Sequence, residues 1–180
     1  MNETNTYKRL KNNSRTNVPD KLIIHHGGGT DLEPLLDTSN HTAQTMEAWH
    51  LAKGWDGLGY QYVIHKNGDI WRGRPEHIQG AHALGQNSAS IGICLSGNFD
   101  ATLPTKEQEN ALIKLITEIR GRYPVIGDKI FPHRKYAVKS CFGRKLSDTW
   151  ALDLMKQKPT LTKDTILKKV EELKTLIIEL

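Results

Sequence analysis

The chain has 180 residues, of which 37% are hydrophobic, and its 25 Lys or Arg outnumber its 20 Asp or Glu to give a formal net charge of +5. This length supports one hydrophobic core and is too short for two ordinary domains. Two cysteines are too few for a disulfide framework, so we do not expect a disulfide-stabilised scaffold. The positive charge predicts attraction to a polyanion, such as nucleic acid, an anionic membrane or an anionic cell wall, without choosing among them.

Residues 1–18 are polar and rich in Asn, Lys and Arg, which predicts a polar N-terminal tail with too few apolar side chains to order it. The start of the chain has no apolar core of a signal peptide, and no later segment is apolar over the length of a membrane span. We therefore expect the protein to be made and kept in the cytoplasm, with no export route of its own.

Residues 21–26 are an apolar run that ends in two histidines and is followed by three glycines. This pattern predicts a buried strand that presents a side chain at its end and then turns sharply. Because successive strand residues point to opposite faces, only one of His25 and His26 can face a given site, and the pattern does not say which. Residues 27–40 are predicted to form a loop that borders a cleft.

The middle of the chain mixes helical and strand patterns. Residues 42–53 repeat apolar side chains at helical spacing, which predicts an amphipathic helix. Residues 60–66 and 70–74 flank Asn-Gly-Asp, the strongest hairpin signal in the chain. Residues 90–97 are an apolar run typical of a central strand, and residues 105–123 open with a capping-box pattern and continue as a helix. The order predicts an α/β fold with a central mixed β-sheet flanked by helices.

After the predicted main domain, residues 19–155, the pattern changes. Apolar residues recur at alternating steps of four and three, which predicts a C-terminal amphipathic helix over residues 159–180 with the spacing of a coiled-coil seam. A short isolated helix is only marginally stable in water, so we expect the apolar stripe formed by these residues to pack against a surface. Three surfaces remain open: the chain's own domain, a second copy bound through residues 161–180, or a membrane.

A short strand at residues 129–132 leads into a segment with chemistry-bearing side chains. His133, Lys139 and Cys141 are spaced at i, i+6 and i+8, which is too wide for one helix face and fits a loop around a metal ion. A thiolate and a neutral imidazole suit zinc, and catalytic zinc sites use three protein ligands and leave a place for water, whereas structural sites use four. The loop supplies two ligands, and the histidine pair at the end of the first strand is the obvious source of a third. The alternative is a structural metal site, or no site.

Several segments resemble one enzyme family in their order and residues: Ile23 to His26, Trp49-His50 with Gly54-Trp55, Gly59 to Ile64, Asp69 to Arg74, Gly80 to Ala83 with Asn87, Ser90 to Cys94, and His133 to Cys141. Over about residues 20 to 150 the chain resembles the zinc N-acetylmuramoyl-L-alanine amidases, which include phage lysozyme-amidases and peptidoglycan recognition proteins. The resemblance implies that family's fold, one Zn²⁺ per chain, and bacterial peptidoglycan rather than nucleic acid as the partner.

The resemblance also implies roles for individual residues. The zinc ligands would be His25, His133 and Cys141. Tyr60 matches the tyrosine beside the metal, and Lys139 matches the catalytic lysine of the phage enzymes.

Three further residues of the matching motifs, His82, His26 and Asn87, are candidate substrate contacts. For the two histidines, the alternative is a position in the core or in the lining of the cleft. Cys94 stands where cytosolic anhydromuropeptide amidases have a glutamate, and we expect a buried small hydrophobic residue there. The chain also has Cys141-Phe142-Gly143 where many family members have Cys-Pro-Gly.

The implied reaction is hydrolysis of the amide bond between N-acetylmuramic acid and L-alanine, and the implied role is that of a lytic endolysin that reaches the wall through a separate permeabilising protein. Zinc lowers the pKa of its bound water to about 7 and polarises the scissile carbonyl. Lys139 would stabilise the charge that builds on the carbonyl oxygen, and Tyr60 would hydrogen-bond the water or the intermediate. The alternatives are a non-catalytic peptidoglycan-binding module and a cytosolic muropeptide-recycling amidase.

Overall fold

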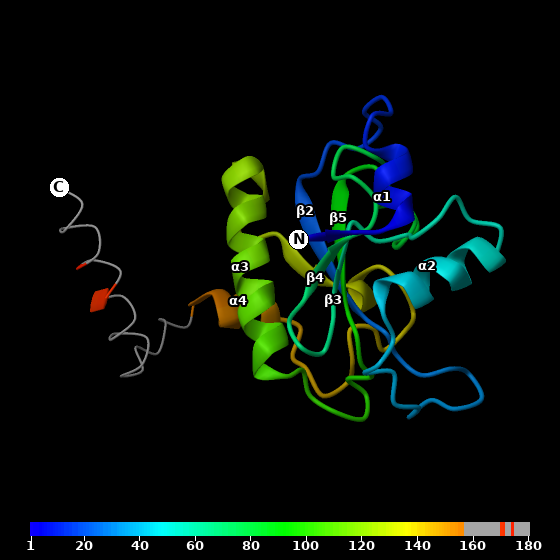
Figure 1. The fold of residues 1–180 in the computed structure, drawn as a ribbon. Coiled ribbons are helices and arrows are strands. Elements are labelled where there is room, and N and C mark those ends of the chain that lie inside the picture. Colours follow the sequence, from blue (N-terminus) through cyan, green and yellow to red (C-terminus); the bar gives the residue numbers. More distant parts are fainter. Residues whose placement is uncertain (157–169, 172–173, 175–180) are drawn as a thin grey trace.

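The computed structural model describes residues 1–156, 170–171 and 174, so the predicted helix of residues 159–180 lies almost wholly outside the described residues. A six-stranded mixed sheet in the order β1-β4-β3-β5-β2-β6 forms its centre (Figure 1). The strands are β1 (Asn2–Glu3), β2 (Lys21–His26), β3 (Tyr62–Ile64), β4 (Ile70–Arg72), β5 (Ser90–Leu95) and β6 (Ile130–Pro132). The helices are α1 (Asn5–Leu10), α2 (Ala43–Ala52), α3 (Lys106–Arg122) and α4 (Trp150–Lys156), with 3-10 turns η1 (Pro124–Ile126) and η2 (His133–Lys135).

The strand pairing agrees with the predicted mixed sheet. β2 runs parallel to both β5 and β6, and β3 is parallel to β5. β3 and β4 form the predicted hairpin, whose antiparallel register pairs Ile64 with Ile70, and Gly68 in its turn has a φ of 85°. That positive φ is why the turn needs glycine. Helix α3 begins with the predicted capping box, formed by Thr105 and Gln108.

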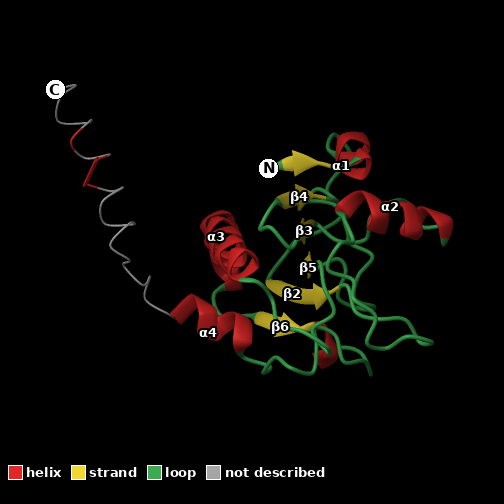
Figure 2. Cartoon of the chain, turned by 60° about the horizontal axis from the view of Figure 1, so that its bottom comes forward, coloured by secondary structure: helices red, strands yellow, loops and turns green. Residues whose placement is uncertain are grey.

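The two faces of the sheet are covered by different helices. Helices α3 and α4 cover one face, and α1 and α2 lie on the other (Figure 2). Alternation along the strands sends Leu22 and Ile24 into the core beneath α3, whereas Val63 and Cys94 pack with Met46 of α2. Residues at odd positions of β2 therefore face the α2 side. Among the described residues no helix has the length and apolar character needed to cross a membrane.

The N-terminal segment differs from the predicted polar tail, because its first residues are part of the fold. Strand β1 extends the sheet by pairing in parallel with β4, and α1 follows it. Thr6 and Leu10 of α1 are 1% and 4% exposed. The Asn17 side chain is also buried, and its amide donates to the carbonyls of Glu76 and Ser90 at 2.8 and 2.9 Å. The segment is held in place mainly by hydrogen bonds to distant backbone, which composition does not reveal.

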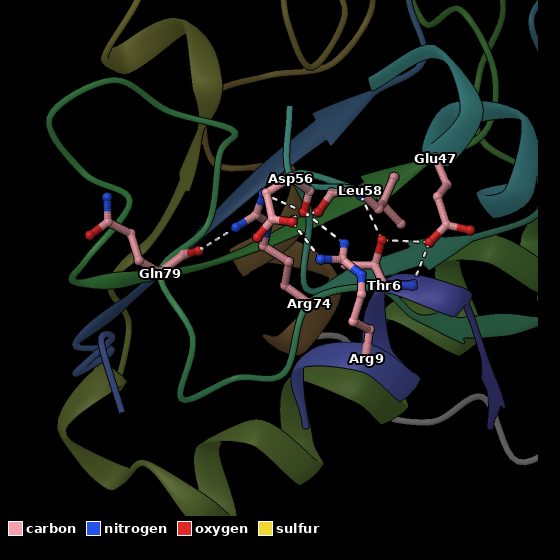
Figure 3. A network of polar contacts seen from close by, with 7 residues as sticks. All are labelled: Thr6, Arg9, Glu47, Asp56, Leu58, Arg74 and Gln79. Carbon is pink, nitrogen blue, oxygen red and sulfur yellow. Dashed lines mark hydrogen bonds and ion pairs between the residues drawn. The ribbon is translucent and has the colours of Figure 1, made fainter. Parts of the chain in front are cut away.

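A polar network joins α1 to the elements beside it (Figure 3). The Thr6 amide and hydroxyl both donate to the Glu47 carboxylate of α2, and the same hydroxyl accepts from the Leu58 amide at 2.9 Å. Arg9 pairs with the carboxylate of Asp56. These contacts attach the N-terminal helix to the segment that leads into β3.

Candidate metal centre

Parallel pairing of β2 and β6 brings two histidines to the same edge of the sheet. The register pairs Ile24 with Pro132. The residue after Ile24 is His25, the next residue of β2, and the residue after Pro132 is His133, the first residue of η2. Carboxyl ends of parallel strands meet at one edge, and the two imidazole rings lie 4.4 Å apart between centroids. The strand register thus brings together two residues that are more than 100 positions apart.

The loop that follows η2 carries Cys141 back toward these histidines. The Arg134 guanidinium holds the loop by donating to the carbonyls of Gly143 and Leu146, both at 2.7 Å. On the other side, the Asp100 carboxylate accepts from the Ser140 hydroxyl at 2.6 Å and from the Arg144 amide at 2.7 Å. Side-chain bonds therefore brace the loop on both sides of the cysteine.

His25, His133 and Cys141 form a cluster whose ligand atoms all lie within 4.8 Å of one another. The Cys141 Sγ is 3.7 Å from the His25 Nδ1. A tetrahedral zinc with ordinary Zn–N and Zn–S bonds holds two such atoms about 3.6 Å apart. The donor set and its spacing therefore fit zinc. Among the described residues, the cluster contains three potential metal ligands, two histidines and one cysteine.

His82 contacts the second nitrogen of His25 from behind. The His25 Nε2 and the His82 Nδ1 are 3.1 Å apart, and His82 is 9% exposed. Two glycines make room for the His82 ring, because a Cβ added at Gly80 or Gly92 would lie 2.4 or 2.6 Å from ring atoms. The sequence predicts His82 as a substrate contact; in the structure it lines the cleft, and its ring contacts His25, a predicted zinc ligand.

Burial sets the protonation states of the three cluster residues. It lowers the pKa of His25 well below its ordinary value, and the neighbouring His82 adds to this shift. Burial also lowers the pKa of His133, with Lys139 as the second cause. Both imidazoles are therefore neutral at pH 7, as ligands must be, whereas burial raises the pKa of the Cys141 thiol to about 12. Binding of a metal would release the thiol proton.

His26 and Asn87, the other two predicted substrate contacts, have structural partners. The His26 Nδ1 accepts from the Phe99 amide at 2.9 Å, and its ring lies against the Phe99 ring on the α3 side. Burial lowers the pKa of His26 to about 4. The Asn87 Oδ1 accepts from the amides of His82 and Ala83, both at 2.9 Å. His26 still lines the cleft, whereas Asn87 lies behind His82 and supports its loop.

The cluster opens into a cleft of about 740 Å³ that Tyr60 and Lys139 also line. The Tyr60 ring lies 5.0 Å from the His25 ring between centroids. Burial raises the pKa of Tyr60 well above its ordinary value, so its phenol keeps its proton and can donate a hydrogen bond. Beneath Tyr60, Cys94 is fully buried and packs with apolar residues, as predicted.

Aromatic side chains from α2 and the loop after it form one wall of the cleft, and the sequence reasoning did not assign them to the site. Trp49 and Trp55 are 45% and 40% exposed although tryptophan is usually well buried. The His50 ring stacks on Trp55 with centroids 4.5 Å apart. Both tryptophans belong to segments of the family resemblance, which was the one available signal.

Comparisons with known proteins agree on the kind of protein that this cleft belongs to. A family model described as N-acetylmuramoyl-L-alanine amidase matches residues 15–148. The endolysin of Enterobacteria phage K11 is 37% identical over 101 residues, which are 53% of this chain and 66% of that protein. The solved endolysin amidase LysCS from Clostridium intestinale superposes with a TM-score of 0.69 at 30% identity, over 81% of this chain and 88% of that one. Drosophila PGRP-LB superposes with a TM-score of 0.63 at 28% identity, over 83% of this chain and 86% of that one.

Proposed function

The chain belongs to the N-acetylmuramoyl-L-alanine amidase family, and we propose that it cleaves the amide bond between N-acetylmuramic acid and L-alanine in bacterial peptidoglycan, as a lytic endolysin with one Zn²⁺ per chain. The observation that carries the proposal is the cluster of His25, His133 and Cys141 in the lining of a cleft of about 740 Å³. Three protein ligands are the number found in catalytic zinc sites.

The bound metal would lower the pKa of a water molecule and polarise the scissile carbonyl. The chain's own residues would act on the charge that then develops. Lys139 and the protonated phenol of Tyr60 line the same cleft, so both can donate to the carbonyl oxygen as it becomes negative. Donors that are already in place stabilise a transition state without reorganising.

The exposed tryptophans can contact the sugar part of the substrate. Peptidoglycan strands are sugars with apolar ring faces, and Trp49 and Trp55 present ring surface beside the metal cluster. Aromatic rings bury large areas at little loss of side-chain freedom. We assign these two residues to substrate positioning, away from the reacting bond.

The likeness to phage endolysins also supports a location. We propose that the protein is made in the cytoplasm of the producing cell and reaches the wall through a separate permeabilising protein.

The test is digestion of purified cell walls by the full chain, with and without a chelator. The expected result is release of new L-alanine amino termini, loss of this release in the chelator, and its return with added zinc. Tight muropeptide binding without release would indicate a non-catalytic binding module. Cleavage of small anhydro-muropeptides but not of intact walls would indicate a recycling enzyme, and either result contradicts the proposal.

A further inference from the structure

A second cavity, of about 450 Å³, lies away from the metal cleft and shares none of its lining residues. It forms where the end of β4 and the segment after it meet α1 and the C-terminal end of α3. We call it the arginine pocket because four of its lining residues are arginines: Arg15, Arg72, Arg74 and Arg122. The predicted function of the chain uses none of them.

The arginine pocket carries more positive than negative charge. Its lining includes one carboxylate, that of Glu76, against four guanidinium groups. Glu76 is already engaged, because Arg122 donates to its two oxygens at 2.7 and 3.1 Å and the Tyr62 hydroxyl donates at 2.7 Å. Arg122 and Glu76 therefore neutralise each other. Of the three other arginines, Arg72 also contacts a carboxylate outside the lining, that of Glu3 at 3.6 Å, so the pocket keeps an excess of positive charge.

Arg74 is the fixed member of these three. It is 9% exposed, and its guanidinium donates to the backbone carbonyls of Leu58, Gln79 and Asp56 at 2.8, 3.1 and 3.2 Å (Figure 3). These neutral acceptors take three of its five N–H donors and hold it in place without cancelling its charge, and the Asp56 carboxylate, which also acts on Arg74, already pairs with Arg9. A buried charge of this kind is unfavourable unless an anion compensates it.

Arg15 and Arg72 are the accessible members. Among the described residues, the Arg15 guanidinium makes one hydrogen bond, a long one to the Asn17 carbonyl at 3.5 Å. Arg72 lies 3.4 Å from the Tyr7 hydroxyl and 3.6 Å from a Glu3 oxygen, which are both long contacts. Each guanidinium has five N–H donors. Both residues therefore have donors left for a ligand.

We propose that the arginine pocket binds the phosphate group of an organic phosphate ester. Guanidinium groups pair with phosphate through two parallel hydrogen bonds, and the excess of positive charge over carboxylates suits a phosphate dianion better than a single carboxylate. The volume lies within the range of about 300–1,000 Å³ that is usual for small-molecule sites, which leaves room for a small organic group beside the phosphate. The proposal is independent of the amidase function.

The experiment is calorimetric titration of the full chain with sn-glycerol 3-phosphate. We expect one saturable site whose affinity falls at least about tenfold in the double variant Arg15→Gln/Arg72→Gln, because two charge-assisted bonds are lost. Arg15→Gln alone, at an exposed position, should lose part of that affinity. The matched control is Lys114→Gln/Lys129→Gln, which removes the same charge from exposed positions outside the pocket and should bind as the parent does.

Two results would overturn the proposal: absence of saturable binding, or equal weakening in both double variants, which would mean general charge attraction. Thermal unfolding of each variant verifies that it is folded. A second arm uses vesicles of phosphatidylglycerol in phosphatidylcholine. If the parent chain sediments with these vesicles and the double arginine variant does not, the phosphate belongs to a lipid headgroup. If the chain binds glycerol phosphate but not the vesicles, the phosphate belongs to a free or polymer-borne ester.

Discussion

At the scale of single residues, His25 has two ring nitrogens with different partners. Its Nδ1 faces the Cys141 sulfur and its Nε2 faces the His82 Nδ1. If Nδ1 binds the metal, Nε2 carries a proton, and this N–H donates a hydrogen bond to the His82 Nδ1. His82 then directs its own Nε2–H at the Ser90 hydroxyl, 3.5 Å away, and Ser90 donates to the Gln86 carbonyl at 2.7 Å. This chain of contacts selects one tautomer for each histidine.

We therefore expect His82 to support metal binding through His25. Substitution His82→Phe keeps a ring and removes the acceptor, and it should weaken zinc binding about 10- to 100-fold, the usual effect of losing a partner of a metal ligand. Competition with a chromophoric chelator measures this. His82→Gln, which keeps an acceptor, should recover part of the affinity, and His77→Gln serves as the control. Zinc binding by the Phe variant as tight as that of the parent would contradict the role.

Lys139 is expected to act on the reaction and not on metal binding. Lys139→Ala should lower kcat on purified walls about 100- to 1,000-fold, the usual effect of removing a donor to a developing oxyanion. Its zinc content should stay the same, because an ammonium group does not bind the metal. Lys145→Ala, an exposed lysine of the same loop, is the matched control. A loss of zinc in the Lys139 variant would show that the residue has a structural role instead.

His50 predicts a dependence of stability on pH. Burial lowers its pKa to about 4, below the value of about 6.5 in an unfolded chain. Between these values the unfolded chain binds a proton that the folded one does not, so the free energy of unfolding decreases as the pH falls from 6.5 toward 4. Because His50 is only partly buried, solvent screening reduces the contribution below the roughly 3 kcal/mol that the full shift would give. Urea unfolding across this window should show a shallower slope for His50→Gln, and identical slopes would contradict the assignment.

At the scale of elements, the N-terminal strand and helix are an added edge of the sheet that depends on polar contacts. Thr6 reaches Glu47, 41 positions away, and Leu58. The composition of this segment predicted a tail because the segment has few apolar side chains. In the structure, backbone pairing to β4 and buried hydrogen bonds hold these elements instead. Helix α3 and the β3–β4 hairpin were predictable because their caps, turn and apolar period are local.

Thr6→Val tests the attachment of α1. The change keeps the shape of the side chain and removes a hydroxyl that serves Glu47 and the Leu58 amide, so two buried polar groups lose a partner. The free energy of unfolding should fall by about 1–3 kcal/mol. Denaturant unfolding measures it, and Thr117→Val on the exposed surface of α3 is the control, with an expected change within about 0.5 kcal/mol. Equal stability of parent and Thr6 variant would mean that α1 is only loosely attached.

At the scale of the whole molecule, a deletion can test whether the apolar stripe of residues 161–180 mediates self-association. Its seam-like spacing predicts that residues 161–180 need a surface, and a second copy of the chain is one candidate. If the stripe mediates self-association, deletion of the residues after Pro159 should lower the molar mass measured by light scattering. Activity on soluble muropeptides should be nearly intact, because the metal cleft is built from residues before 145. An unchanged mass would rule this role out.

The whole fold also explains which parts of the site could be foreseen. The mixed sheet, the hairpin and the long helix follow from local periods, and His133 and Cys141 follow from the spacing within one loop, so these were predictable from the amino-acid order. The strand pattern of β2 allows either His25 or His26 to face a site, and only the family resemblance favoured His25. The register with β5 and β6 sends His25 to the cluster and His26 to Phe99.

Tertiary structure also decided what His82, Asn87 and the arginines do. His82 and His25 are 57 positions apart, and Asn87 meets backbone amides that only the folded loop presents. The arginine pocket collects residues from five separate stretches of chain. The residue types of a motif and the local elements can be read from the sequence. The partner of a polar side chain depends on which distant segments the fold brings beside it, and no short-range pattern contains that information.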